Sequence, residues 1–424
     1  MRLLFLTTFA TPIDKEHYFT KGVYRTLKGK CPRNEVEVHL GTIYYGKGIE
    51  AHHEESYHNI YLSGTDGFSE QNQKALRIWI QNLAPDVIHS NMVEGFEIEA
   101  ARDLDIPIFN TIHIGGVLCP RGGGNGFLDE NDNICSRTIG ERCKCCMVKD
   151  LPFPGVGRVL QAIIPGFIKK AIGGSERFFL YLSPLVGFEN RIAGALRKKD
   201  LLNYSHLIVA NRKLISILER NGITHNNIML PHGVGQRQRL PNRIERPVKF
   251  YYLGRIQYSK GLHIVLDAFK GIDNQLYELH IFGDAETDGR SQAYETKIKR
   301  ISRGLNVHFH GRIPNKELEA HLSNMNVMIH PAVYLEVYGL TIAEALSMGR
   351  PVIASRCGGP EEQIVDGVNG WLFDPKDVDK LRQIINDIIK NPGIIDRMSS
   401  NATLPHSLEA YTDQLIHHYK NSLN

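Results

Sequence analysis

The chain has 424 residues, of which 42% are apolar and 23% are charged, and these fractions are typical of a soluble globular protein. The length predicts two or three domains, and the formal net charge of +4 does not indicate a nucleic-acid partner. No apolar run reaches the roughly 18 residues of a membrane-spanning helix, and the apolar start ends at Pro12, too early for a signal peptide. We therefore expect a cytoplasmic protein whose cysteines are thiols or metal ligands rather than disulfides.

Short apolar runs alternate with segments of helical periodicity along the chain. The runs predict buried strands, in the first half at residues 2–8, 86–90, 106–113 and 206–210, and in the second half at 249–254, 277–283, 307–311, 327–331 and 351–355. Helical patterns lie between them, for example at residues 214–222 and 261–270. This alternation is typical of parallel sheets joined by crossover helices.

A polar segment with two prolines, residues 236–247, indicates the linker between two domains. We predict a doubly wound α/β domain at residues 1–240, with a cysteine-rich insert at about 115–150. A second one follows at residues 241–404, and then a helix at 405–424. Sheets of this kind bind ligands at the carboxyl ends of their strands, so two such domains facing each other would form a binding cleft.

The sequence GRIQYSKG, residues 254–261, joins a predicted strand to a predicted helix. Gly254 allows a tight turn, and Arg255 and Lys260 then lie on a loop at the carboxyl end of the strand. Two cations in such a place suit a phosphate or a diphosphate. A solvated loop with two surface cations is the alternative.

The sequence EVYGLTIAE, residues 336–344, also follows a predicted strand. Gly339 would open a helix whose first N–H groups, together with those of Leu340 and Thr341, form an anion site. Glu344 lies within about two turns of that helix start, where a carboxylate could hold the two hydroxyl groups of a ribose, and Glu336 could hold those of a second sugar. The alternative is a helix-capping pattern followed by a surface glutamate.

Together with GRIP at residues 311–314 and ASRCGGPEEQIVDGVNGWLF at 354–373, these motifs closely resemble family 4 of the retaining glycosyltransferases, which have the GT-B fold. The resemblance covers the C-terminal half and implies two Rossmann-like domains facing across a cleft, with the last helix crossing back to the first domain. It implies a nucleotide-sugar donor, with Arg255 and Lys260 on the diphosphate, Glu344 on the ribose and Glu336 on the sugar. The positions that would line the donor site are Gly254, Arg255, Lys260, Gly283, Arg312, Ile313, Glu336, Gly339, Leu340, Thr341 and Glu344.

The N-terminal half matches this family more loosely. His113 ends a predicted strand in TIHIGG, where a histidine of the family faces the reacting sugar, and His113, Glu336, Arg255 and Lys260 would form the catalytic set. His232 replaces an asparagine of the family, and the loop after the first strand has a single glycine, Gly22, in place of a pair.

The resemblance implies transfer with retention of configuration, in which the leaving phosphate assists deprotonation of the acceptor. No metal is expected to take part, because the Asp-x-Asp sequences at residues 103–105 and 377–379 occur at predicted helix ends and Arg255 and Lys260 can neutralise the leaving diphosphate. The expected reaction moves a hexose from a nucleotide-diphosphate sugar, with a UDP-sugar favoured, to a glycan or lipid-linked acceptor in polysaccharide biosynthesis. A nucleotide-sugar epimerase and a metal-bound scaffold without activity are the alternatives.

Two further segments carry predictions of their own. Residues 155–213 have ten Lys and Arg against three Asp and Glu and include an apolar helical stripe from 156 to 172, a pattern that either packs in a core or lies on the inner face of the cell membrane. Cys143 and Cys146 have C-x2-C spacing, and with Cys119 and Cys135 they could form a structural four-thiolate site, with zinc favoured over an iron–sulfur cluster. Cys145 would be the spare thiol, and free thiols in a loop are the alternative.

Overall fold

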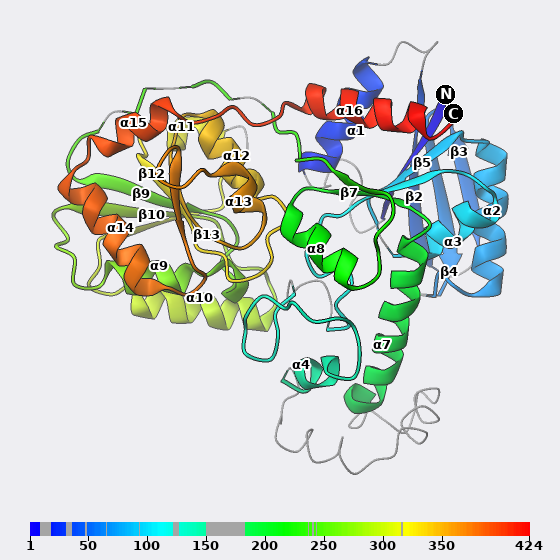
Figure 1. The fold of residues 1–424 in the computed structure, drawn as a ribbon, viewed down its shortest axis with the longest axis horizontal. Helices are drawn as coiled ribbons and strands as arrows, with labels where there is room; N and C mark the ends of the chain where they lie inside the picture. Colours follow the sequence, from blue (N-terminus) through cyan, green and yellow to red (C-terminus); the bar gives the residue numbers. More distant parts are fainter. Residues whose placement is uncertain are drawn as a thin grey trace. The chain divides into compact units, whose positions relative to one another are not determined.

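The computed structural model describes residues 1–8, 18–30, 36–46, 49–64, 66–92, 94–121, 127–149, 183–235, 237–239, 241–242, 244–314 and 317–424. They form two compact units (Figure 1). Unit 1 comprises Met1–Asn131, Cys135–Gly233 and Leu408–Asn424, and unit 2 comprises Asp132–Ile134 and Val234–Ser407. The main boundary therefore lies after Gly233, whereas the sequence indicated residue 240.

Unit 1 contains an eight-stranded sheet of order β3-β4-β2-β1-β5-β6-β7-β8. The predicted strands are β1 (Arg2–Thr8), β5 (Val87–Ser90), β6 (Ile108–Thr111) and β7 (His206–Val209). The sequence did not predict β2 (Glu37–Gly46), β3 (Glu50–Glu54), β4 (Tyr57–Ser63) or β8 (Asn227–Met229). Neighbouring strands are parallel except β3 and β4, which pair in antiparallel register.

The described helices of unit 1 connect these strands, except the last one, which ends the chain. They are α1 (Tyr18–Lys30), α2 (Glu70–Leu83), α3 (Phe96–Asp103), α4 (Cys143–Lys149), α7 (Ser183–Leu202), α8 (Arg212–Arg220) and α16 (Leu408–Asn421). The last helix follows unit 2 in the chain but lies in unit 1 beside α1 (Figure 1). Its buried Tyr419 places Oη 2.6 Å from Nδ1 of His89 on β5.

Unit 2 contains a six-stranded parallel sheet of order β11-β10-β9-β12-β13-β14. The strands are β9 (Val248–Leu253), β10 (Tyr277–Phe282), β11 (Val307–Gly311), β12 (Val327–His330), β13 (Val352–Ser355) and β14 (Gly370–Phe373). The first five were predicted from their apolar runs, and β14 was not. Because every described pair in this sheet is parallel, the loops after the strands meet at one edge.

Helices cover both faces of the unit 2 sheet. One face packs in an apolar cluster against α9 (Leu262–Phe269), α10 (Gly289–Ile301) and α14 (Val378–Lys390). The other packs against α11 (Leu318–Leu322) and α12 (Leu340–Ser347). The shorter elements are η2 (Tyr258–Lys260), α13 (Gly359–Gln363) and α15 (Ile394–Ser400).

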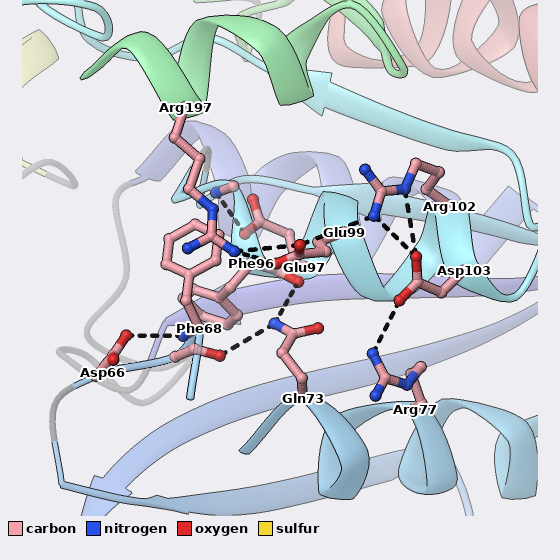
Figure 2. Close-up of polar contacts among 12 residues, drawn as sticks. Asp66, Phe68, Gln73, Arg77, Phe96, Glu97, Glu99, Arg102, Asp103 and Arg197 are labelled. Carbon is pink, nitrogen blue, oxygen red and sulfur yellow. Dashed lines mark hydrogen bonds and ion pairs between the residues drawn. The ribbon is translucent and has the colours of Figure 1, made fainter. Parts of the chain in front are cut away.

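The basic segment 155–213 is described only from residue 183 onward, so the apolar stripe at 156–172 lies outside the described residues. On α7, Arg197 donates to Glu99 of α3 at 2.8 Å and its guanidinium carbon stacks 3.9 Å from the Phe68 ring centroid (Figure 2). Lys198 lies 3.8 Å from Glu94. Glu94 and Glu99 lie before residue 155 in the chain. Part of the positive charge of the basic segment is therefore neutralised by acidic residues that do not belong to it. None of the described helices is both long and apolar enough to span a membrane.

Candidate functional site

Three loops of unit 2 are tied together at the carboxyl ends of their strands. The Gly254 N–H donates to the Phe282 carbonyl at 3.0 Å, and the Gly283 N–H donates to the Gly311 carbonyl at 2.7 Å. A Cβ at position 283 would lie 2.0 Å from the Gly254 carbonyl oxygen. Glycine is therefore required at Gly283 by the close approach of two backbones, a structural reason that does not depend on a ligand.

The loop after β9 brings Lys260 to the loop after β12. Gly261 has a left-handed φ of +74°, and a Cβ there would lie 2.0 Å from the Pro331 carbonyl oxygen. The Val333 N–H donates to the Ser259 carbonyl at 2.9 Å. These contacts hold the two loops side by side, so residues that are more than 70 positions apart in the chain become neighbours.

Lys260 and Glu336 form an ion pair at this junction. Lys260 Nζ donates to Glu336 Oε2 at 2.7 Å and to Tyr334 Oη at 2.6 Å, and Tyr334 Oη donates to the same carboxylate oxygen at 2.6 Å. His330 Nε2 lies 3.4 Å away from that oxygen. Burial by itself would raise the pKa of Glu336, but the charges and hydrogen bonds of Lys260 and His330 together outweigh it and hold the pKa well below its usual range. The site therefore contains a buried carboxylate that stays ionised.

The start of α12 lies next to this carboxylate. The Glu336 backbone is fixed because its N–H donates to Cys357 and its carbonyl accepts from Gly359, at 2.9 and 2.8 Å. Gly339, with a left-handed φ of +85°, is the N-cap residue, and the helix begins at Leu340 as predicted. The first N–H groups of a helix have no partner within the helix, so those of Leu340 and Thr341 are suited to an anion.

Glu344 has a partner that the sequence did not predict. Its Oε1 accepts from Arg237 Nη2 at 3.1 Å, and both side chains are about nine-tenths buried. Arg237 lies in the segment that the sequence indicated to be a linker. The Arg237 guanidinium therefore orients the Glu344 carboxylate. A ribose bound by Glu344 would share that carboxylate with the guanidinium.

The remaining predicted donor residues are more exposed. Arg255 pairs with Glu286 at the surface, with Nη1 to Oε1 at 2.5 Å. The Arg312 N–H donates to Asp284 Oδ2 at 3.1 Å, and Ile313 packs against the apolar cluster under α11 and α12. All three lie on the loops at the carboxyl edge of the sheet, so the structure brings the predicted donor residues of unit 2 to one region.

The predicted residue His113 belongs to the other compact unit, unit 1. His113 follows β6, is half-buried, and its Nε2 lies 2.8 Å from Asn91 Oδ1. The prediction of Gly22 in the loop after β1 was wrong, because Gly22 lies within α1, where a Cβ would meet Leu408 at 2.9 Å. Asp103 is the last residue of α3 and Asp377 is the N-cap of α14, so both Asp-x-Asp sequences do lie at helix ends.

Four side chains that support these sites were not predicted from the sequence: Asn91, Arg237, His330 and Tyr334. His330 could have been noticed, because it ends a buried strand at its carboxyl end. No local pattern distinguishes Arg237 or Tyr334. Their role depends on chain segments far away in the sequence.

Comparisons with known proteins identify a glycosyltransferase family model and glycosyltransferase relatives. Residues 236–404 match the family model described as "Glycosyl transferases group 1". The match covers nearly all of unit 2 and includes Lys260, Glu336 and Glu344. Among curated proteins, the chain is 32% identical over 170 residues to D-rhamnosyltransferase WbpZ of Pseudomonas aeruginosa, covering 39% of this chain and 42% of that protein. It is 29% identical over 171 residues to lipopolysaccharide 1,6-galactosyltransferase of Salmonella typhimurium, covering 37% and 46%. The aligned part thus spans less than half the length of either relative.

Solved structures extend the likeness to the whole fold. Sucrose-phosphate synthase of Thermosynechococcus elongatus matches with a TM-score of 0.67 at 17% identity, over 99% of this chain and 98% of that one. HepE of Anabaena in complex with UDP-glucose matches with a TM-score of 0.64 at 15% identity, over 99% and 100%. The chain therefore has the GT-B fold of two parallel-sheet α/β domains, as predicted.

Proposed function

We propose that this protein is a glycosyltransferase that moves a hexose from a nucleotide-diphosphate sugar to a glycan or lipid-linked acceptor. The observation that carries the proposal is the buried Lys260–Glu336 pair beside the start of α12, within the segment that matches the group 1 glycosyl transferases. This arrangement places a cation, a carboxylate and the N–H groups of a helix start together, as a donor with a diphosphate and a sugar requires.

In this proposal each group has a separate part of the donor. Arg255, Lys260 and the α12 N-terminus would bind the diphosphate. The N–H groups of Gly339, Leu340 and Thr341 would supply the anion site, and Gly254 and Gly283 would lie on the loops beside it. Glu344, oriented by Arg237, would accept the ribose hydroxyl groups, and Arg312 and Ile313 would border the base. A UDP-sugar is favoured because the structural neighbour HepE is described in complex with UDP-glucose.

The proposed reaction retains the configuration of the sugar. The bond between the anomeric carbon and the diphosphate oxygen breaks, and the acceptor oxygen bonds to that carbon on the same face. The acceptor proton passes to the leaving phosphate. Lys260 and Arg255 stabilise the charge of the leaving group, Glu336 contacts the sugar, and His113 would face the reacting sugar from unit 1. No metal ion is part of the proposed step.

The acceptor proposal rests on what the relatives are named for. One is a lipopolysaccharide galactosyltransferase and another a rhamnosyltransferase, so a growing cell-surface glycan is a suitable acceptor class for a role in polysaccharide biosynthesis.

We further infer a cytoplasmic enzyme that contacts the inner face of the cell membrane through residues 155–213. Flotation with anionic vesicles tests that contact, and a protein that stays at the bottom of the gradient contradicts it.

The activity is tested by incubating the protein with a panel of UDP-, GDP- and dTDP-hexoses. A transferase releases the nucleoside diphosphate slowly by hydrolysis, and faster when a glycan acceptor is added. An epimerase would convert the sugar with no nucleotide release, and a scaffold would do neither. The anomeric configuration of the product, from NMR coupling constants, tests retention, and full activity in EDTA tests metal independence.

Variants locate the activity within the structure. Arg255→Ala and Lys260→Ala each remove a cation from the leaving group, which costs about 2–5 kcal/mol of transition-state stabilisation. Lys270→Ala is the matched control, because Lys270 forms an exposed pair with Asp267 on α9. Normal activity in both site variants would rule out the diphosphate assignment.

A further inference from the structure

A group of polar side chains lies on the unit 2 sheet, on strands β10 and β11. Glu278 and His280 are two positions apart on β10 and so share one face of the sheet. His308 pairs with His280 on the neighbouring strand β11. Within the described ranges, these three residues are the one group of three or more histidine, cysteine and acidic side chains whose potential ligand atoms all lie within 4.8 Å of one another. Three potential metal ligands thus meet at one place on the sheet.

The two strands present the same arrangement side by side. His280 Nε2 lies 3.0 Å from Glu278 Oε2, and His308 Nε2 lies 3.1 Å from Asn306 Oδ1. The two imidazole rings are stacked, with centroids 4.9 Å apart and planes at 23°. Both rings therefore direct Nε2 toward an oxygen two positions earlier in the same strand. Imidazole nitrogen and carboxylate oxygen are ligands that zinc commonly takes in proteins.

The orientation of His308 is fixed although this residue is exposed. The amide group of Asn306 donates from Nδ2 to the Asn274 and Tyr277 carbonyls, at 3.0 and 2.8 Å. These two bonds leave Oδ1 of the same amide facing the His308 ring. An amide oxygen only accepts hydrogen bonds, so it holds the His308 ring in place through Nε2–H in the metal-free protein.

The other nitrogen of the His280 ring has a partner of its own. His280 Nδ1 lies 2.9 Å from His310 Nε2, and the two rings are stacked with centroids 5.2 Å apart. His310 is in turn stacked on Phe282, with centroids 4.4 Å apart. Either nitrogen of such a pair can be the donor. When Nε2 of His280 binds a metal ion, Nδ1–H can therefore donate to His310, as a metal-binding histidine usually does to a neighbouring acceptor.

Unit 1 contains a similar arrangement without the third ligand. On β2 and β4, His39 Nε2 lies 2.8 Å from Glu37 Oε1, and His39 Nδ1 lies 2.7 Å from His58 Nε2. The register of these two strands places Ser56 beside His39, where unit 2 has His308. Hydrogen bonds alone thus satisfy the glutamate and the two histidines in unit 1, and the additional imidazole distinguishes unit 2.

We propose that Glu278, His280 and His308 bind a structural zinc ion, with His310 as the outer partner of His280. Each imidazole gives up its Nε2–H hydrogen bond and carries the proton on Nδ1 instead, so two neutral rings bind zinc without a net release of protons. Ligand atoms around a tetrahedral zinc ion stand about 3.3 Å apart, so a small movement from the observed arrangement closes the site.

The place of this site in the sheet defines its role. β11 is the edge strand, and a zinc ion would link its first half to β10. The donor residues lie at the opposite, carboxyl ends of the strands, so the zinc ion would stabilise unit 2 without entering the transfer reaction. Lys249 Nζ lies 3.8 Å from Glu278 Oε2, and this partly exposed side chain would turn toward solvent when zinc binds.

The cysteines predicted from the sequence to bind zinc are a competing place for the metal. They are Cys119, Cys135, Cys143 and Cys146, and none of them forms a disulfide. All four lie within the described residues, but no three of them have sulfur atoms within 4.8 Å of one another. The four-thiolate site stays a prediction, and the experiment must separate it from the histidine site.

The test titrates Zn²⁺ into the full-length protein after removal of metal by a chelator, in a reductant that contains no thiol. His308→Ala removes one of three ligands and should raise the Kd of one zinc ion by more than about 100-fold, and His310→Phe should raise it by about 10- to 100-fold. The matched control is His52→Gln, because His52 forms an exposed pair with Glu50 on the edge strand β3, at 3.7 Å. The control should bind zinc as the unmodified protein does.

Cobalt identifies the ligand type. Co²⁺ bound by imidazole and carboxylate should give visible bands that His308→Ala removes and Cys143→Ser leaves unchanged. Thiolate ligands would instead add an intense charge-transfer absorption that Cys143→Ser removes. A second metal ion lost only in Cys143→Ser would report the thiolate site, and the loss of the first in His308→Ala would still support the proposal.

Three outcomes would overturn the proposal. They are the absence of zinc binding, zinc binding by His308→Ala that is as tight as in the unmodified protein, and a cobalt spectrum that comes entirely from thiolates. His308 is exposed, so its alanine variant should fold, and thermal unfolding without metal checks this. If that variant fails to fold, the cobalt spectrum of the unmodified protein decides between imidazole and thiolate ligands.

Discussion

At the scale of single residues, the two glutamates of EVYGLTIAE have different partners. Glu336 is paired with Lys260 and with the hydroxyl group of Tyr334, whereas Glu344 is paired with Arg237. In each case the partner is a cation from another part of unit 2. The carboxylates are therefore oriented without a ligand, which reduces the reorganisation that ligand binding would need.

The first prediction concerns the Lys260–Glu336 pair. Lys260→Met leaves the Glu336 carboxylate buried and uncompensated, and the free energy of unfolding should fall by about 3–5 kcal/mol. Urea denaturation at pH 7 measures this. Glu286→Gln, which breaks the exposed pair with Arg255, should change stability by less than about 1 kcal/mol. Equal effects of the two substitutions would mean that burial does not strengthen the Lys260 pair.

The same pair predicts a pH dependence. The pKa of Glu336 is lower in the folded protein than in the unfolded chain, so its stabilising contribution is complete above the unfolded value of about 4.3. That contribution should decrease as pH falls below this value toward the folded pKa. Unfolding free energies from pH 7 to pH 3 should therefore fall more steeply for the unmodified protein than for Glu336→Gln. Parallel curves would contradict the assignment.

A third prediction separates the roles of the two glutamates in ligand binding. Glu344→Gln weakens the hydrogen bonds to the ribose and should raise the Kd for UDP, by about 10-fold or more for a bond of 1.5–3 kcal/mol to a charged group. Arg237→Met should raise it as well, because the carboxylate loses its orientation. Glu336→Gln should leave UDP binding unchanged and lower the turnover number. Calorimetric titration decides, and equal loss in both glutamate variants would reject this division.

At the scale of elements, the turn at Gly261 decides where the site forms, and the turn at Gly271 provides a comparison. Gly261 and Gly271 both have a left-handed φ, +74° and +84°, but only at Gly261 would a Cβ meet another backbone, 2.0 Å from the Pro331 carbonyl oxygen. At Gly271 nothing lies within 4 Å. The first turn therefore requires glycine for packing between loops, and the second for backbone conformation alone.

The fourth prediction uses this pair of turns. Gly271→Ala should cost about 1–2 kcal/mol, the strain of a side chain in the left-handed region. Gly261→Ala should cost more, and it should also reduce activity, because the loops that place Lys260 beside Glu336 must separate. Denaturation and turnover of the two variants test the claim. A Gly261→Ala protein with full activity would show that loop contact does not position Lys260.

At the scale of the whole molecule, the C-terminal helix completes a unit that the chain began about 400 residues earlier. Tyr411, Leu415 and Tyr419 of α16 are buried in unit 1, and Tyr419 reaches His89. Burial lowers the pKa of His89 to about 3, with a smaller contribution from His113. A neutral imidazole therefore links α16 to the strand beside β1.

The fifth prediction tests this closure. Tyr419→Ala should lower the free energy of unfolding of unit 1 by about 3–5 kcal/mol, as for other large aromatic deletions from a core. Gln414→Ala, at an exposed position of the same helix, should have little effect. Hydrogen exchange locates the change, which is expected in peptides from β1 and β5. A loss of protection in unit 2 instead would contradict the place of α16 in unit 1.

The sequence by itself determined the features that depend on neighbouring residues. Buried parallel strands appear as short apolar runs, which is why nine strands were predicted from residues 2–8 to 351–355. The half-polar strands β2 and β4 were missed because their buried side chains include His39, Thr42 and His58, which obscure the apolar pattern. Strand β3 was missed because it lies at the edge of the sheet and its residues 50–52 are exposed. The start of α12 at Leu340 followed from one glycine, since the left-handed N-cap is a local property.

The tertiary structure alone decided which charges meet. Lys260 and Glu336 are separated by 76 positions, and Arg237 and Glu344 by 107, so no local pattern could pair them. Pairing of distant side chains depends on how strands and loops pack, and that packing results from the burial of many residues together rather than from any one motif.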